Sequence, residues 1–184
     1  LYRTTGPAFN ANPFTPIGAG NLTKVGTMTV SFIDVNGGTL RYTVNGVQVA
    51  KAIQRQVYGS RAAACFPTTA SRAAATNYQD LWWNAAESGW GINVTHQDNT
   101  LFATLFTYRA DGRGAWFVMS NGVRQPGTFN FTGTLYRTAA AAFDAVPWTE
   151  ATATPAGTMT AAFASGNSGT LSYTLDGVTV SKPI

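Results

Sequence analysis

The stretch LYRTTGPAFNANPFT at residues 1–15 returns, with most letters unchanged, as LYRTAAAAFDAVPWT at residues 135–149. Further along, GGTLRYTVNGVQVAKAI at residues 37–53 matches SGTLSYTLDGVTVSKPI at residues 168–184 without a gap. Similarity of this extent within one chain is the mark of a structural repeat. We therefore expect the two segments to share one fold and one strand register.

Only the second copy has a further block in front of it. Residues 77–134 have no counterpart before the first copy. The chain is thus expected to hold the C-terminal half of a first repeat at residues 1–59 and a complete second repeat at residues 77–184. Residues 60–76, rich in Ala, Ser and Thr, have the composition of a linker between them.

The complete repeat shows the two-residue period of β-strands. WGINVTH at residues 90–96 alternates between two faces, and LFATLFTY at residues 101–108 is rich in aromatic and other strand-favouring residues. Turn formers such as Asp176-Gly177 separate the segments, which gives about eight strands. The expected fold class is all-β: an antiparallel meander that closes into a barrel, with a two-layer sandwich as the alternative.

One connection in the complete repeat is too long for a hairpin. It covers residues 139–156 and contains Phe143 and Trp148. We expect it to cross one mouth or edge of the barrel with these two rings as apolar anchors.

The first repeat supplies only about four strands of an eight-strand unit, and an isolated half barrel leaves unpaired edges and an open apolar face. Three arrangements would cover that face: a front half upstream in a longer precursor, packing of residues 1–59 on the complete unit, or a neighbouring subunit. The third gives a head-to-tail contact between copies of the chain. We favour this third arrangement, because each chain carries one incomplete and one complete unit, and it makes the protein a self-assembling subunit of an extracellular filament or surface layer.

Composition bears on location and partners. Only 11% of the residues are charged, where about a quarter is usual, and the net charge of +4 is thinly spread. This favours an extracellular or cell-surface protein whose signal peptide has been removed or lies outside this chain. Basic residues do not cluster among aromatics, which argues against nucleic acid, and no apolar run is long enough to be a membrane-spanning segment.

The residues give little support for a catalytic or metal site. Cys65 is the single cysteine, so it is either an unpaired linker thiol or the site of an intermolecular disulfide. His96 is the single histidine and has no nucleophile motif around it, and the carboxylates show no spacing typical of a glycosidase pair. We predict a protein that is not an enzyme, with no catalytic residue, no metal and no cofactor.

The order WW, ESGWG, FATLFTY, ADG and GTLYRT between residues 82 and 138, with LYRTTGPAF at the start of the chain, resembles a tandem repeat of predicted secreted and surface proteins from environmental proteobacteria. The resemblance covers nearly the whole chain. It implies export and display in tandem copies, and it carries over no catalytic residue.

A binding function is the alternative. Strand alternation turns Trp82 and Trp83 to opposite faces, so one of them lies outside the core or lines a barrel mouth. Together with Glu87 and Trp90 of the ESGWG motif they are the tentative ligand-binding residues, for a polysaccharide or a small apolar ligand. The competing interpretation is structural, with Trp90 in the core and Glu87 bonded to nearby groups.

Overall fold

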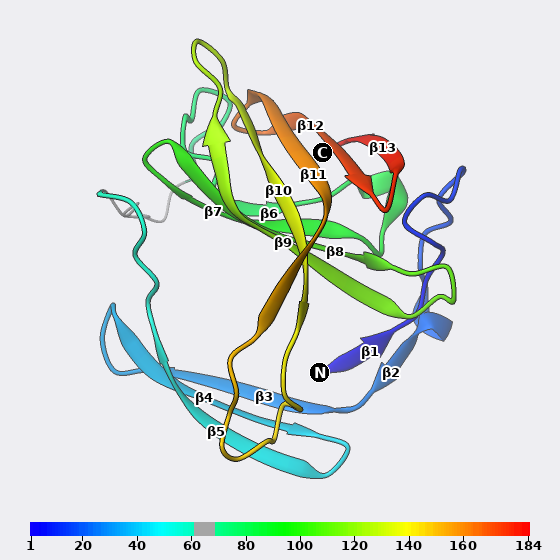
Figure 1. Cartoon of the computed structure of the whole chain (residues 1–184), viewed down its shortest axis with the longest axis vertical. Coiled ribbons are helices and arrows are strands. Elements are labelled where there is room, and N and C mark those ends of the chain that lie inside the picture. The colour runs from blue at the N-terminus through cyan, green and yellow to red at the C-terminus, as the bar shows by residue number, and fades with distance from the viewer. Residues whose placement is uncertain (61–68) are drawn as a thin grey trace.

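The computed structural model describes residues 1–60 and 69–184, which form three antiparallel sheets (Figure 1). The largest sheet has eight strands, each paired with its neighbours in the chain: β6 (Asp80–Trp82), β7 (Gly91–Gln97), β8 (Thr100–Tyr108), β9 (Gly114–Arg124), β10 (Asn130–Ala139), β11 (Thr152–Ser165), β12 (Ser168–Leu175) and β13 (Val178–Pro183). The smaller sheets pair β1 (Tyr2–Thr4) with β2 (Leu22–Lys24), and β3 (Gly26–Phe32) with β4 (Gly37–Val44) and β5 (Val47–Gln54). Two short 3-10 helices, Ala19–Asn21 and Ala85–Glu87, complete the described elements.

The eight-stranded sheet curls into a half-barrel that holds the core on its inner side. Strand alternation sends every second side chain inward, and Leu101, Leu105, Met119, Phe131 and Leu171 are among the fully buried ones. The prediction of an all-β antiparallel meander is confirmed. Among the described residues, the edge strands β6 and β13 do not pair with each other, so the curl is not closed by backbone hydrogen bonds.

The two copies of the repeat have the same strand register. Tyr2 lies opposite Lys24 where the second copy has Tyr136 opposite Pro155. The ladders that follow also match, because β3, β4 and β5 pair as β11, β12 and β13 do. We call residues 77–134 the front half, and each segment that runs from a Leu-Tyr-Arg-Thr start through three further strands a back half. The described chain therefore contains two back halves and one front half.

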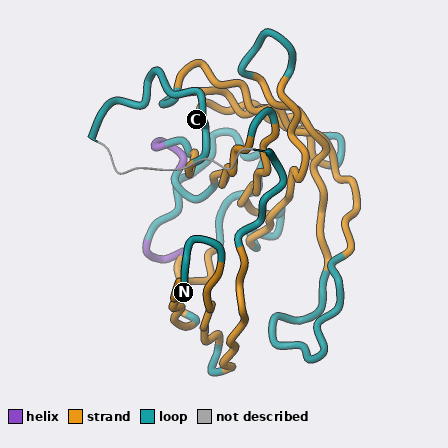
Figure 2. Tube along the Cα trace, turned by 90° about the vertical axis from the view of Figure 1, so that its left-hand side faces the viewer, coloured by secondary structure: helices purple, strands orange, loops and turns teal. Residues whose placement is uncertain are grey.

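The loops that cross each back half are exchanged between the two copies. The first crossing segment (residues 5–21) lies on the complete unit, where the Phe9 ring packs 6.3 Å from that of Tyr173. The second crossing segment (residues 140–151) lies on the small β3–β5 sheet, where the Phe143 ring packs 6.0 Å from that of Tyr42. Figure 1 shows the β10–β11 connection reaching down to β4 and β5, and Figure 2 gives the same arrangement from the side.

The exchange of crossing segments shows that one prediction from the sequence was wrong. Phe143 and Trp148 were expected to anchor residues 139–156 across the mouth or edge of their own barrel. They anchor it instead on the first copy, because Tyr42 donates a hydrogen bond to the Phe143 carbonyl (3.3 Å) and the Lys51 ammonium lies 3.9 Å from the centre of the Trp148 ring. The equivalent place on the complete unit is filled from the first copy.

One glycine in each copy allows a close backbone approach. A Cβ atom at Gly157 would lie 1.7 Å from the carbonyl oxygen of Thr174, and one at Gly26 would lie 1.6 Å from that of Thr43. No side chain fits at these distances, so both positions need glycine for the neighbouring strand to pair.

Replacing Gly157 by alanine should therefore lower the free energy of unfolding by about 1–3 kcal/mol, the usual cost of forcing extra atoms into a packed site. Thermal melting followed by circular dichroism measures the effect. Gly18→Ala is the matched control, because a Cβ atom there meets nothing within 4 Å. Equal melting curves for the two variants would contradict the close approach.

Candidate functional site

A partly buried ion pair, with Lys182 buried and Glu87 23% exposed, joins the two ends of the half-barrel. The Lys182 ammonium on β13 lies 2.5 Å from a carboxylate oxygen of Glu87, which ends the short helix after β6. The Trp90 indole N–H donates to the same oxygen over 2.8 Å. The Lys182 side chain is only 8% exposed, and its ammonium faces the rings of Phe14 and Trp90 at 4.9 and 5.2 Å. Charge-assisted bonds of this kind are strong where water is excluded.

The partners of this ion pair come from three parts of the chain. Glu87 and Trp90 belong to the front half, Lys182 belongs to the back half, and Phe14 comes from the first crossing segment. The front half, the back half and the first crossing segment therefore meet at the buried Lys182 ammonium. We call the cluster of Lys182, Glu87, Trp90 and Phe14 the lock. Its ion pair connects β13 to the helix after β6, and in the described structure no backbone hydrogen bonds pair β6 with β13.

The first copy has the same site without its front half. Lys51 is the counterpart of Lys182, and Trp148 takes the place of Phe14 over its ammonium. Among the described residues, Lys51 makes no ion pair, because the residue that would correspond to Glu87 belongs to a front half. The half unit thus presents a cation beside an aromatic ring with the carboxylate position open.

The inner face of the β3–β5 sheet is open as well. Met28 and Phe32 are 53% and 77% exposed, whereas their counterparts Met159 and Phe163 are 1% and 5% exposed. Val30 on the same strand is also exposed. The sequence therefore specifies a core face in both copies, and only the copy with a front half buries it.

One edge of this sheet is free in the described structure. β3 pairs with β4 alone, while its counterpart β11 pairs with β12 on one side and with β10 on the other. The stretch of β10 that covers the equivalent edge, residues 130–134, is the last part of the front half. A front half would thus supply both the missing strand and the missing core.

The tentative ligand-binding residues do not form one site. Trp82 is buried and its indole N–H donates to the Tyr78 carbonyl (2.8 Å), whereas Trp83 is 52% exposed, so the two rings face opposite ways as predicted. Glu87 and Trp90 meet in the buried lock rather than on a surface. Cys65 and its proposed intermolecular disulfide lie outside the described residues.

The sequence reasoning missed the lysines. Lys51 and Lys182 occupy the same place in VAK and VSK near the ends of the two aligned segments. A lysine repeated on the core side of an otherwise apolar strand signals a buried partner. The alignment therefore contained a signal that identifies Lys182 as part of a buried site, but it did not identify Glu87 as the partner.

His96 is a core residue of the complete unit. Its Nδ1 accepts the Tyr78 N–H (3.1 Å) and its Nε2 lies 2.7 Å from the Asp98 carbonyl, which fixes a neutral imidazole with the proton on Nε2. The ring stacks on Tyr78 and meets Phe131 edge-on. Burial lowers the pKa of His96 below its ordinary 6.5, with Arg124 acting in the same direction and the Asp98 carbonyl and carboxylate opposing it.

The described residues form neither a metal-ligand cluster nor a helix that could span a membrane. No group of three or more His, Cys, Asp or Glu side chains lies close enough to hold a metal ion. Neither short helix in the described part of the chain has the length and apolar character needed to cross a bilayer.

Removing the carboxylate of the lock should destabilise the complete unit. Glu87→Ala leaves the Lys182 charge buried and unpaired, which we expect to cost about 3 kcal/mol of unfolding free energy in denaturant titration. The double variant Glu87→Leu/Lys182→Met should recover most of the loss. Glu150→Ala, at an exposed position, is the control, and a loss no larger than that control would show that the pair does not close the unit.

His96 predicts a pH dependence with a definite sign. Because its pKa is lower in the folded than in the unfolded chain, its contribution to stability is complete above about pH 6.5 and is lost as the pH falls below that value. The melting temperature of the parent protein should drop more between neutral pH and about pH 5 than that of His96→Asn. Parallel pH profiles of the two proteins would contradict a depressed pKa.

Comparison of the chain with protein-family models, with curated proteins and with solved structures finds no match in any of the three. What the chain does is inferred below from its internal repeat, from the buried lock and from the surfaces that the fold leaves open.

Proposed function

We propose that the chain is a non-enzymatic structural and interaction module of an extracellular assembly built from such repeats. Its working surface is the open half unit, residues 1–59, which docks a front half supplied by a neighbouring chain. The low content of charged residues and the resemblance to exported tandem repeats support an extracellular or surface location.

The observation that carries the proposal is the contrast between the two copies. The complete unit demonstrates what covers a back half: four strands that bury Met159 and Phe163 and bring a glutamate to Lys182. The half unit repeats that back half, with Lys51 and the exposed Met28 in the matching positions. The partner is therefore defined chemically as a β-strand segment with the pattern of residues 77–134.

The number of front halves and back halves limits which assemblies can close every repeat. Residues 1–184 hold two back halves and one front half, so copies of this segment alone that exchange front halves leave one back half open in each copy. Complete closure requires a neighbour with a front half to spare. Copies of the same repeat, covalently longer than this chain or joined to another one, meet that requirement and give the head-to-tail contact expected from the sequence.

Two lengthened chains test the proposal. Residues 77–134 placed before Leu1 reproduce the junction that joins residue 134 to Leu135, and this chain should be a closed monomer. Residues 54–134 placed after Ile184 reproduce the junction after Ile53 but put the spare front half at the opposite end. This second chain should form head-to-tail polymers whose length grows with concentration, followed by light scattering and electron microscopy.

The lysine of the open half unit supplies the specific control. Lys51→Glu should stop polymer growth in the second chain, and Glu87→Lys in the appended copy should restore it, because the swapped charges can pair again. Lys24→Glu, at an exposed position on β2, should have no effect. A second chain that remains monomeric, or one whose polymers ignore Lys51→Glu, would refute docking at the half unit.

A further inference from the structure

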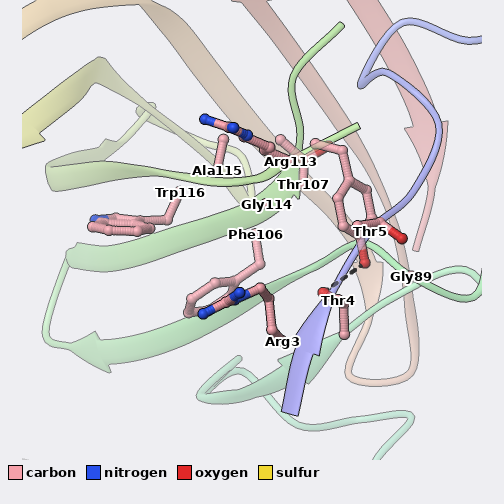
Figure 3. A pocket seen from close by; sticks show the side chains of 11 residues that line it. Arg3, Thr4, Thr5, Gly89, Phe106, Thr107, Arg113, Gly114, Ala115 and Trp116 are labelled. Atoms are coloured by element: carbon pink, nitrogen blue, oxygen red, sulfur yellow. Dashed lines mark hydrogen bonds between the residues drawn. The ribbon is translucent and has the colours of Figure 1, made fainter. Parts of the chain in front are cut away.

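A separate cleft lies on the outer side of the half-barrel, beside β1. It has a volume of about 550 Å³ and is lined by Arg3, Thr5, Phe106, Arg113 and Trp116 together with neighbouring backbone. Figure 3 shows the Phe106 and Trp116 rings on one side of the sheet, with the Arg3 side chain beside Phe106 and Arg113 at the start of β9 on the other side of that strand. Clefts of this size are typical of ligand sites.

The aromatic rings form a row across the strands. Gly91 of β7, Phe106 of β8 and Trp116 of β9 are successive register partners, so their side chains point to the same face. Trp83 lies at the glycine end of the row, where its Cβ is 3.5 Å from the position a Gly91 side chain would take. Phe106 also lines a second hollow of about 400 Å³ that includes Trp83, so its ring borders both hollows, which together we call the groove.

These rings are held at the surface rather than packed away. Trp116 is 56% exposed and donates its indole N–H to the Thr138 hydroxyl (3.2 Å), and Phe106 is also exposed. Tyr108, two residues further along β8, is buried because β1 covers it and Thr4 accepts a hydrogen bond from its hydroxyl (3.0 Å). The first copy therefore shapes one wall of the cleft and leaves the adjacent rings open.

The cleft carries positive charge with little compensation. In the second copy, Arg137 pairs with Asp176 at 2.8 Å. In the first copy Asn45 stands at the position of Asp176, and Arg3, the counterpart of Arg137, makes no ion pair among the described residues. Arg113 has only a long, exposed contact with Asp111 (3.9 Å), and no Asp or Glu lines the cleft.

From these features we propose that the groove from Trp83 to Trp116 binds a linear polysaccharide that carries carboxylate groups, such as a polyuronate. The apolar C–H face of a sugar ring packs flat on Trp83, Phe106 or Trp116, while its hydroxyls remain in water. The guanidinium groups of Arg3 and Arg113 pair with carboxylates, for which a planar fork of N–H donors is suited. Two neighbouring hollows along a row of rings fit a polymer better than a single sugar.

The geometry favours a glycan over a peptide or a nucleic acid. The groove crosses paired strands on a sheet face, so the backbone groups that would hold an extended peptide are already used within the sheet. A single-stranded nucleic acid brings a charge on every residue and would need a denser track of basic groups than two arginines. This binding site goes beyond the assembly proposed above: it takes Arg3 from the half unit but none of Met28, Val30 and Phe32, the exposed residues of the β3–β5 sheet.

Calorimetric titration of the full chain with a short oligogalacturonate provides the test. We expect saturable binding that weakens as salt is added, and at least about tenfold weaker binding to a neutral oligosaccharide of equal length. Trp116→Ala and Arg3→Ala should each reduce the affinity for oligogalacturonate by about tenfold or more, with unchanged thermal melting as the check on folding. Arg41→Ala and Trp148→Phe, which change an arginine and a tryptophan outside the groove, should bind as the parent does.

Each contrary result overturns the assignment. Absence of binding to oligogalacturonate removes the ligand class, and equal binding of the neutral oligosaccharide removes the role of the arginines. Tighter binding of a single-stranded oligonucleotide or of an acidic peptide of equal length would show that the groove serves a different macromolecule. If Arg3→Ala and Trp116→Ala both retain the parent affinity, the ligand binds elsewhere. None of these readings depends on whether the half unit docks a front half.

Discussion

The exchange of crossing segments holds the two copies of the repeat in one structure. Phe9 and Phe14 of the first copy complete the core of the second, while Phe143 and Trp148 of the second copy cover part of the first. Without Phe14 the aromatic surroundings of the Lys182 charge would be incomplete, and without residues 140–151 more of the β3–β5 sheet would face water. Each copy thus depends on the other for apolar burial that it cannot supply itself.

Each copy receives a crossing segment from the other, but only the second copy has a front half. It closes one back half, pairs β10 with β11 and brings Glu87 to Lys182. The other back half retains the same apolar face, the same lysine and an unpaired strand edge in the described structure. This contrast between one closed and one open copy of a single design underlies our proposal that the open copy docks a front half from a neighbouring repeat.

Much of this fold could be predicted from local patterns. Alternation placed Trp82 and Trp83 on opposite faces, and the repeat alignment implied equal registers, because both depend on residues close in the sequence or on direct comparison of two segments. The exchange could not be predicted, since similarity states what each crossing segment resembles but not which copy it contacts. The Glu87–Lys182 pair joins residues 95 positions apart and depends on how far the sheet curls. The exposed pair Phe106 and Trp116 depends on where β1 stops covering the sheet.

Hydrogen exchange of the monomeric chain, resolved by segment, tests the central claim that one copy is closed and the other open. Backbone amides in β11 and β12 should exchange slowly, because they lie in the interior of a sheet with a buried core, and those of the equivalent β3 and β4 should exchange faster at the same pH and temperature. Because the two segments share their register and most of their sequence, each serves as the reference for the other. Equal, strong protection of both segments in a monomer would contradict an open half unit and with it the docking surface.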